Sequence, residues 1–138
     1  MYKVIMVPVD LRHTDRLKKA LATAADLCRH YGAKALYVSV TSSAPSEVAH
    51  TPKEFSEKLA AFAAAQTAQF GHSATSHAVV SPDPAIDLDD VLLKAAGEVS
   101  ADLIVMASHV PNIADYVWPS NGGRVAAHAK VSVLVVRD

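Results

Sequence analysis

The sequence predicts an α/β protein: a single doubly wound, five-stranded parallel sheet with helices on both faces. Short, continuous apolar runs, typical of strands that are buried on both faces, alternate with longer segments in which apolar residues recur at helical spacing. Right-handed crossovers between parallel strands then place helices on both faces of the sheet. The 138 residues, of which 51% are hydrophobic, can bury a sizeable core, so we expect one domain over residues 1–138.

The first third of the chain predicts a strand, a helix and a second strand. The first strand is Val4–Val9, an apolar run. The helix Thr14–Tyr31 follows, with Thr14 as its expected N-cap and Gly32 in the left-handed position that ends it. Leu36–Val40 is the second strand.

The middle of the chain predicts two further helices around a weaker strand. The second helix begins at Thr51, because Thr51 and Glu54 have the spacing of a capping box and Pro52 suits the first helical position. Thr75–Val80 is the third strand, and Ala85–Val99 is the third helix.

The last third predicts the fourth strand at Leu103–Met106, a short helix at Asn121–Ala129 and a final strand at Val133–Val136.

The amino-acid composition excludes several classes of protein. Thirteen basic and 14 acidic residues give a net charge of −1, which does not fit a nucleic-acid-binding protein. The single cysteine, Cys28, indicates a reduced compartment, and the apolar N-terminal run is too short for a secretory signal or a membrane span. We expect a cytoplasmic protein without a membrane partner.

Ligands of open parallel sheets bind outside the carboxyl ends of the strands. The residues expected there are Asp10 after the first strand, Val40 at the end of the second, and Ala107, Ser108 and His109 after the fourth. The sequence has neither the G-x-G-x-x-G motif of dinucleotide-binding domains nor a P-loop. The acids of a response-regulator receiver and the Ser/Thr/Gly-rich first loop of a flavodoxin are absent as well.

Five segments instead resemble the universal stress protein family. They are Val7–Asp10 (V-P-V-D), Gly32–Leu36, Ala101–His109 (A-D-L-I-V-M-A-S-H), Arg124–Ala129 and Val133–Arg137. The resemblance covers essentially the whole chain. It implies a Rossmann-like fold of the adenine nucleotide alpha hydrolase type, with strand order 3-2-1-4-5, and a protein of the stress response.

Many members of this family bind ATP, and the resemblance implies where. Their motif G-x-x-G-x(9)-G-[ST] would place its first two glycines at Ala107 and Val110 and its last two residues at Ser120 and Asn121, so every glycine is missing here. Glycines in this motif let backbone N–H groups approach phosphates at a helix N-terminus.

A second branch of the family, with the pattern A-S-H-R-P-D-I, a Tyr and then L-L-G-S-N, is closer to this chain. Residues 107–113, Tyr116 and residues 117–121 match it without a gap, except that Val110 replaces Arg and Pro119 replaces Gly. Val110 removes a charged donor and Pro119 a backbone N–H, which together weaken phosphate binding by about 2–4 kcal/mol.

The resemblance therefore implies a site for ATP or another adenine nucleotide, with Mg²⁺ as an accompanying ion. In nucleotide-binding relatives the strand-end Asp lies near ribose and adenine, with Val9 and Val40 lining the base; the alternative is that Asp10 only caps its own turn. The expected binding residues are Pro8, Val9, Asp10, Val40, Met106, Ala107, Ser108, His109, Val110, Ser120, Asn121 and Gly122.

No catalytic or metal-binding arrangement is predicted. His109 has no second ligand at metal spacing, and the loop serines have no His–Asp partners. At most slow ATP hydrolysis is expected. His128 is expected at a helix end, and the remaining histidines at the surface. Because relatives dimerise through the last strand, the resemblance implies a homodimer through Val133–Val136. The alternative function is a dimeric interaction or regulatory protein that binds no nucleotide.

Overall fold

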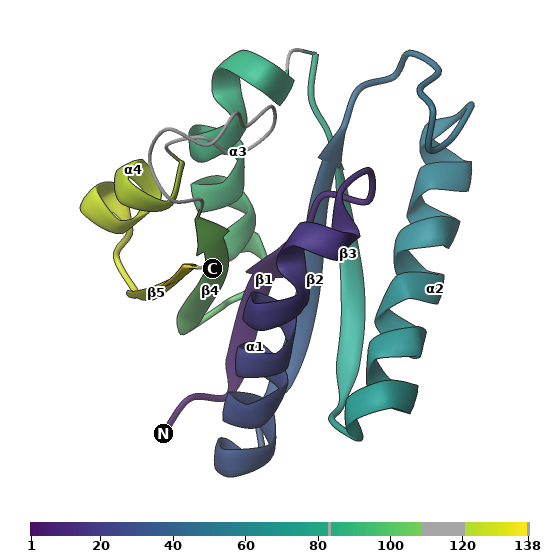
Figure 1. Ribbon diagram of the computed structural model, residues 1–138. Helices are drawn as coiled ribbons and strands as arrows, with labels where there is room; N and C mark the ends of the chain where they lie inside the picture. Colours follow the sequence, from purple (N-terminus) through teal and green to yellow (C-terminus); the bar gives the residue numbers. More distant parts are fainter. Residues whose placement is uncertain (83, 109–120, 138) are drawn as a thin grey trace.

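The computed structural model describes residues 1–82, 84–108 and 121–137. Within these ranges the strands form one parallel sheet with the order β3-β2-β1-β4-β5, which confirms the predicted topology (Figure 1). The strands are β1 (Val4–Pro8), β2 (Lys34–Thr41), β3 (Ala74–Val80), β4 (Leu103–Ser108) and β5 (Ser132–Arg137). The helices are the 3-10 turn η1 (Thr14–Leu17), α1 (Lys18–Tyr31), α2 (Pro52–Phe70), α3 (Pro84–Glu98) and α4 (Asn121–His128).

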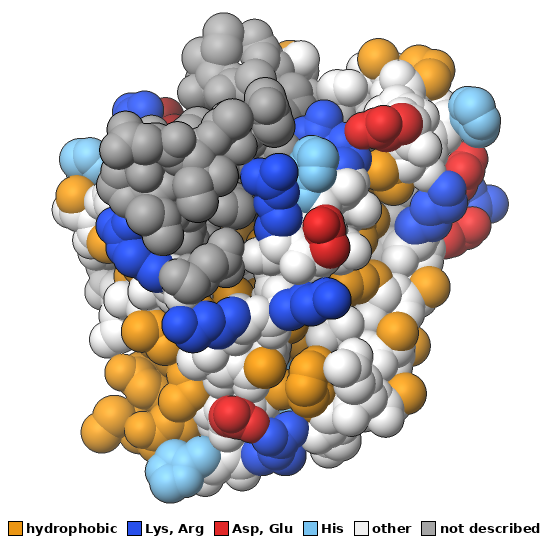
Figure 2. All heavy atoms as spheres, in the orientation of Figure 1, with side chains coloured by type: hydrophobic (Ala, Val, Ile, Leu, Met, Phe, Trp, Pro, Cys, Tyr) orange, Lys and Arg blue, Asp and Glu red, His pale blue; other side chains and the backbone are white. Residues whose placement is uncertain are grey.

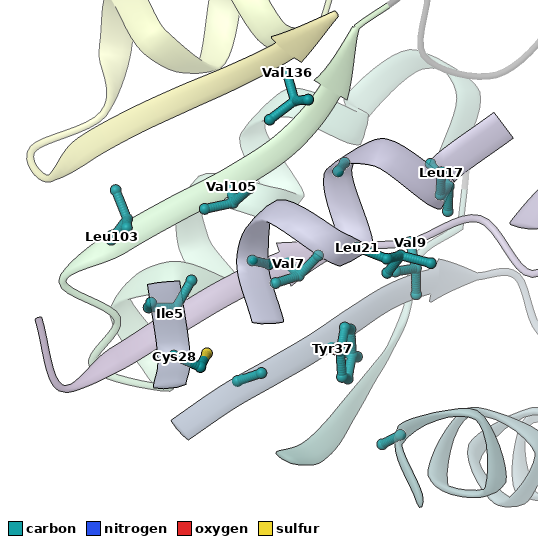
Figure 3. Close-up of a cluster of buried hydrophobic side chains, with 14 of the residues drawn as sticks. Ile5, Val7, Val9, Leu17, Leu21, Cys28, Tyr37, Leu103, Val105 and Val136 are labelled. Atoms are coloured by element: carbon teal, nitrogen blue, oxygen red, sulfur yellow. The ribbon is translucent and has the colours of Figure 1, made fainter. Parts of the chain in front are cut away.

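Two apolar cores lie on the two faces of the sheet. Alternate residues of β1 point to opposite faces, because side chains of a strand alternate. Ile5 and Val7 pack with α1 and α2, whereas Met6 packs with α3 and α4. Figure 3 shows the first of these cores, in which β1, β2 and β4 meet the inner side of α1. The predicted helices on both faces are confirmed.

The sheet brings the carboxyl ends of neighbouring strands together. The chain passes from β1 outward to β2 and β3, and then returns to place β4 against the other side of β1, with Ile5 opposite Leu103. The strand order therefore reverses between β1 and β4. In open α/β sheets this switch point is where ligands bind.

The predicted start of the second helix is confirmed, except that the Glu54 carboxylate reaches one residue beyond the N-cap. The Thr51 hydroxyl accepts a hydrogen bond from the Glu54 N–H at 3.1 Å. The Glu54 carboxylate accepts one from the backbone N–H of His50 at 3.2 Å, one residue before the cap. Both contacts satisfy backbone donors at the helix N-terminus. Gly32 also takes the predicted left-handed conformation, with φ of 65°.

The prediction for the start of the first helix was wrong. Thr14 begins the 3-10 turn η1, whose N-cap is His13, and α1 begins only at Lys18. Neither His13 nor Leu17 makes a side-chain capping bond. The physical reason is a preceding turn: the carbonyl of Asp10 accepts the N–H of His13 at 3.0 Å, and this tight bend leads into 3-10 geometry.

In the part of the chain that the structure describes, no helix combines the length and apolar character that crossing a membrane requires.

Candidate functional site

The carboxyl edge of the sheet carries the predicted site residues that the structure describes. Asp10 follows β1 after one residue, Val40 lies next to the last residue of β2, and Ala107 and Ser108 end β4. The backbone of α4 begins at Asn121, on the far side of β4 from Asp10. The predictions for His109, Val110 and Ser120 lie outside the described residues.

Two hydrogen bonds fix the chain just before Asp10. The N–H of Val9 donates to the carbonyl of Val38, and the Ser39 hydroxyl donates to the carbonyl of Val9, both at 2.8 Å. Ser39 is buried, so its hydroxyl ties β1 to β2 inside the protein. The backbone that presents Asp10 is therefore held rigidly on one side by β2.

Asp10 is 7% exposed, and its two carboxylate oxygens have different surroundings. Oδ1 accepts the backbone N–H of Arg12 at 3.0 Å and its Nε at 3.3 Å. Oδ2 is buried and has no hydrogen-bond partner among the described residues. Asp10 thus caps its own turn, as one alternative predicted, and also retains an acceptor that its capping role does not use. Leaving such a buried acceptor unpaired costs about 1–3 kcal/mol, so Oδ2 favours a donor that the described residues do not supply.

Apolar residues surround this end of the sheet. Pro8 and Val9 are buried beside Asp10, and Val40 and Ala107 are partly exposed. Met106 is 1% exposed and belongs to the core beneath α3 and α4, so it supports the end of β4 from within.

An ion pair that the sequence analysis missed holds α4 against α3. Arg124 Nε lies 3.2 Å from Oδ2 of Asp89, whose side chain is 6% exposed. Asp89 lies on α3 and Arg124 in the first half of α4, so the pair holds the N-terminal half of α4 against α3. The sequence contained a signal for this ion pair. Asp89 lies inside an apolar helical segment, and a buried acid requires a partner.

Cys28 and the histidines also have defined positions. Cys28 is buried in the first core, and burial raises the pKa of its thiol to about 11, which favours packing over redox chemistry. His128 ends α4, as predicted. The expectation that His72 is a surface residue was wrong: it is 4% exposed, because it lies beneath the end of α2 with its Nε2 2.9 Å from the Tyr37 hydroxyl.

The described residues contain no group of three or more His, Cys, Asp or Glu side chains that could hold a metal ion. Their arrangement at the carboxyl edge offers a hydrogen-bond acceptor, apolar contact and helix N–H donors.

A parallel sheet of order 3-2-1-4-5, with a buried acid and a helix N-terminus on opposite sides of its switch point, defines a Rossmann-like α/β protein. The model of the universal stress protein family matches residues 1–137, and the chain belongs to this family. The predicted family resemblance is confirmed.

Individual relatives agree with this assignment. Universal stress protein G of Salmonella typhimurium is 29% identical over 142 residues, which cover 99% of this chain and all of the relative. A universal stress protein solved in complex with cAMP has a TM-score of 0.71 at 22% identity, over 98% of this chain and 97% of the other. The universal stress protein of Archaeoglobus fulgidus, solved in complex with dAMP, has a TM-score of 0.69 at 21% identity, over 97% of both chains.

Proposed function

We propose that this universal stress protein binds an adenine nucleotide at the carboxyl edge of its sheet. The observation that carries the proposal is the Asp10 carboxylate, which lies at the switch point, is buried, and has Oδ2 without a partner among the described residues. A ribose hydroxyl or an exocyclic amine would supply the missing donor. The complexes of two relatives with cAMP and dAMP support this ligand class.

The proposed orientation follows from charge. A 5′-phosphate chain placed against the Asp10 carboxylate, without a cation between them, would be repelled, so the nucleoside lies at β1 and β2, with Val9 and Val40 against the base. The 5′-phosphates lie beyond β4, where the N-terminus of α4 offers backbone N–H groups. The proposed contacts are Pro8, Val9, Asp10, Val40, Ala107, Ser108, His109, Val110, Ser120, Asn121 and Gly122. Met106, which is 1% exposed in the core beneath α3 and α4, would support these contacts from within.

Binding rather than catalysis is the proposed activity. The chain is proposed to act as one cytoplasmic domain over residues 1–138. Mg²⁺ would be held chiefly by the phosphates and water, as is usual for this ion, since the described residues offer no cluster of ligands for it.

A homodimer through β5 is part of the proposal. β5 is an edge strand of the sheet, so one side of its backbone is available for pairing with another strand. Leu134, at its centre, is 38% exposed, which is high for a large apolar side chain. The second candidate function is a dimeric interaction or regulatory protein that binds no nucleotide. The edge strand supports its dimer. Val110 and Pro119 replace residues that favour phosphate binding in relatives, and this favours a protein without nucleotide.

The test is to denature purified protein and analyse the released small molecules, and then to titrate nucleotide-free protein with ATP and Mg²⁺ in a calorimeter. Co-purified adenine nucleotide, or micromolar binding, is the expected result. No release and no heat of binding at millimolar ATP would overturn nucleotide binding and favour the second candidate.

A further inference from the structure

Arg12 contacts the Asp10 carboxylate at the switch point of the sheet. Its backbone N–H and its Nε both bond to Oδ1 of Asp10, at 3.0 and 3.3 Å. Its side chain is nevertheless 45% exposed. Among the described residues, Asp10 is the only partner recorded for its guanidinium, and Nε makes that contact. The two terminal nitrogens of the guanidinium have no hydrogen-bond partner among the described residues.

The surrounding segment is basic. Residues 11–19 carry Arg12, Arg16, Lys18 and Lys19 against one acid, Asp15. Lys18 and Lys19 open α1, whose first turn has no acidic residue. Cations are unfavourable at a helix N-terminus, because the helix dipole places positive charge there. An anion bound nearby relieves this repulsion. Figure 2 shows several Lys and Arg side chains together on this face of the molecule.

The described residues around the N-terminal half of α4 carry less net positive charge than residues 11–19. Arg124 is the basic residue of the first half of α4, and its Nε pairs with the buried carboxylate of Asp89. Val110, by sequence, supplies no charge. Positive charge is therefore concentrated at the end of the site where Asp10 lies rather than at the N-terminus of α4.

We propose that Arg12 contacts the ligand and sets its specificity, favouring nucleotides whose phosphate is attached to the ribose 3′-oxygen, as in 3′,5′-cyclic AMP or 3′-AMP. The proposal rests on the proposed nucleotide site. Oδ2 of Asp10 would accept the 2′-hydroxyl, and the outer nitrogens of Arg12 would donate to the neighbouring 3′-phosphate. The Asp10 carboxylate supplies the acceptor and also anchors the Arg12 guanidinium, so the two groups lie side by side. They therefore fit a hydroxyl and a phosphate on the adjacent ring carbons C2′ and C3′. A 5′-phosphate lies farther from the ribose hydroxyls.

The test is a calorimetric titration of the wild-type protein and of Arg12→Gln with cyclic AMP, 3′-AMP and 5′-AMP. Glutamine keeps the backbone N–H that caps Asp10 but removes the charge. We expect the wild type to bind the first two ligands about 10-fold more tightly than 5′-AMP, and Arg12→Gln to lose about 10- to 100-fold for them and less than about 3-fold for 5′-AMP. Lys18→Gln removes one charge from the same segment without a contact to Asp10, and it is the matched control. It should weaken all three ligands equally and slightly, because an exposed charge is screened by salt.

The outcomes are distinguishable. If the wild type binds no nucleotide, the proposed function fails and this specificity with it. If the wild type binds nucleotides but shows no preference for a phosphate on the ribose 3′-oxygen, or if Arg12→Gln weakens all three ligands alike, the specificity is overturned and nucleotide binding stands. Thermal unfolding of each variant verifies that it is folded.

Discussion

The hydroxyl of Tyr37 and the Nε2 of His72 lie 2.9 Å apart inside the protein, joining β2 to the segment between α2 and β3. Tyr37 is fully buried and His72 is 4% exposed. The Nδ1 of His72 is buried without a partner among the described residues. This contact holds the segment that leads into β3, an edge strand, to the interior of the sheet through an imidazole, whose pKa burial lowers.

We predict that folding stability declines as the pH falls below about 6.5, the ordinary pKa of histidine. Burial lowers the pKa of His72, and the Arg29 guanidinium lowers it further. Below pH 6.5 the unfolded chain binds a proton that the folded chain excludes, so stability is complete above this pH and decreases below it. The contribution reaches at most about 1.4 kcal/mol per pH unit.

Urea unfolding between pH 5 and 8 measures this dependence. His72→Gln should remove most of the slope that lies between the two pKa values of His72. His128→Gln, at an exposed position, is the control and should keep the slope. An unchanged slope in His72→Gln would show that other groups cause the dependence.

The hydroxyl of Tyr37 should contribute to stability through its contact with His72. Tyr37→Phe removes it and leaves Nε2 of His72 buried without a partner, which costs about 1–3 kcal/mol. Urea unfolding of Tyr37→Phe, His72→Gln and the double variant measures the coupling. Strictly additive losses would mean that the two side chains do not act as a pair.

The Arg124–Asp89 ion pair should stabilise α4 more than the rest of the protein. Arg124→Ala leaves the buried Asp89 carboxylate without its cation, but the arginine is 63% exposed, so the expected loss is only about 1 kcal/mol. Amide hydrogen exchange should accelerate in α4 and remain unchanged in α2. Arg124→Lys keeps the charge and should restore part of the protection. Equal acceleration in both helices would contradict a local role.

Short-range features were predictable from the sequence, and contacts between distant segments were not. The cap at Thr51 and the left-handed Gly32 depend on residues within one turn, so their spacing was sufficient. His72 was misjudged because its partner lies 35 residues away. The strand-end position of Asp10 was predictable from topology. Its two unequal oxygens were not, because they depend on the direction of the Arg12 side chain.

The proposed dimer predicts different effects at the two edges of the sheet. Leu134→Lys places a charge at the centre of β5 and should give a monomer, because an edge lysine opposes strand pairing. Val80→Lys is the matched control: Val80 is 51% exposed at the end of β3, the opposite edge strand, and its replacement should leave a dimer. Sedimentation velocity distinguishes these states. A monomeric wild type, or a dimeric Leu134→Lys, would contradict pairing through β5.

Calorimetric titration of the wild-type protein and of Asp10→Asn with 5′-AMP tests the central claim most directly. The asparagine oxygen can still cap the Arg12 N–H, but its amide group cannot accept the donor that Oδ2 is proposed to receive. We predict micromolar binding by the wild type and a loss of about 10- to 100-fold in Asp10→Asn, with no loss of thermal stability. Equal affinities in the two proteins, or no binding by the wild type at millimolar ligand, would contradict a nucleotide site built on Asp10.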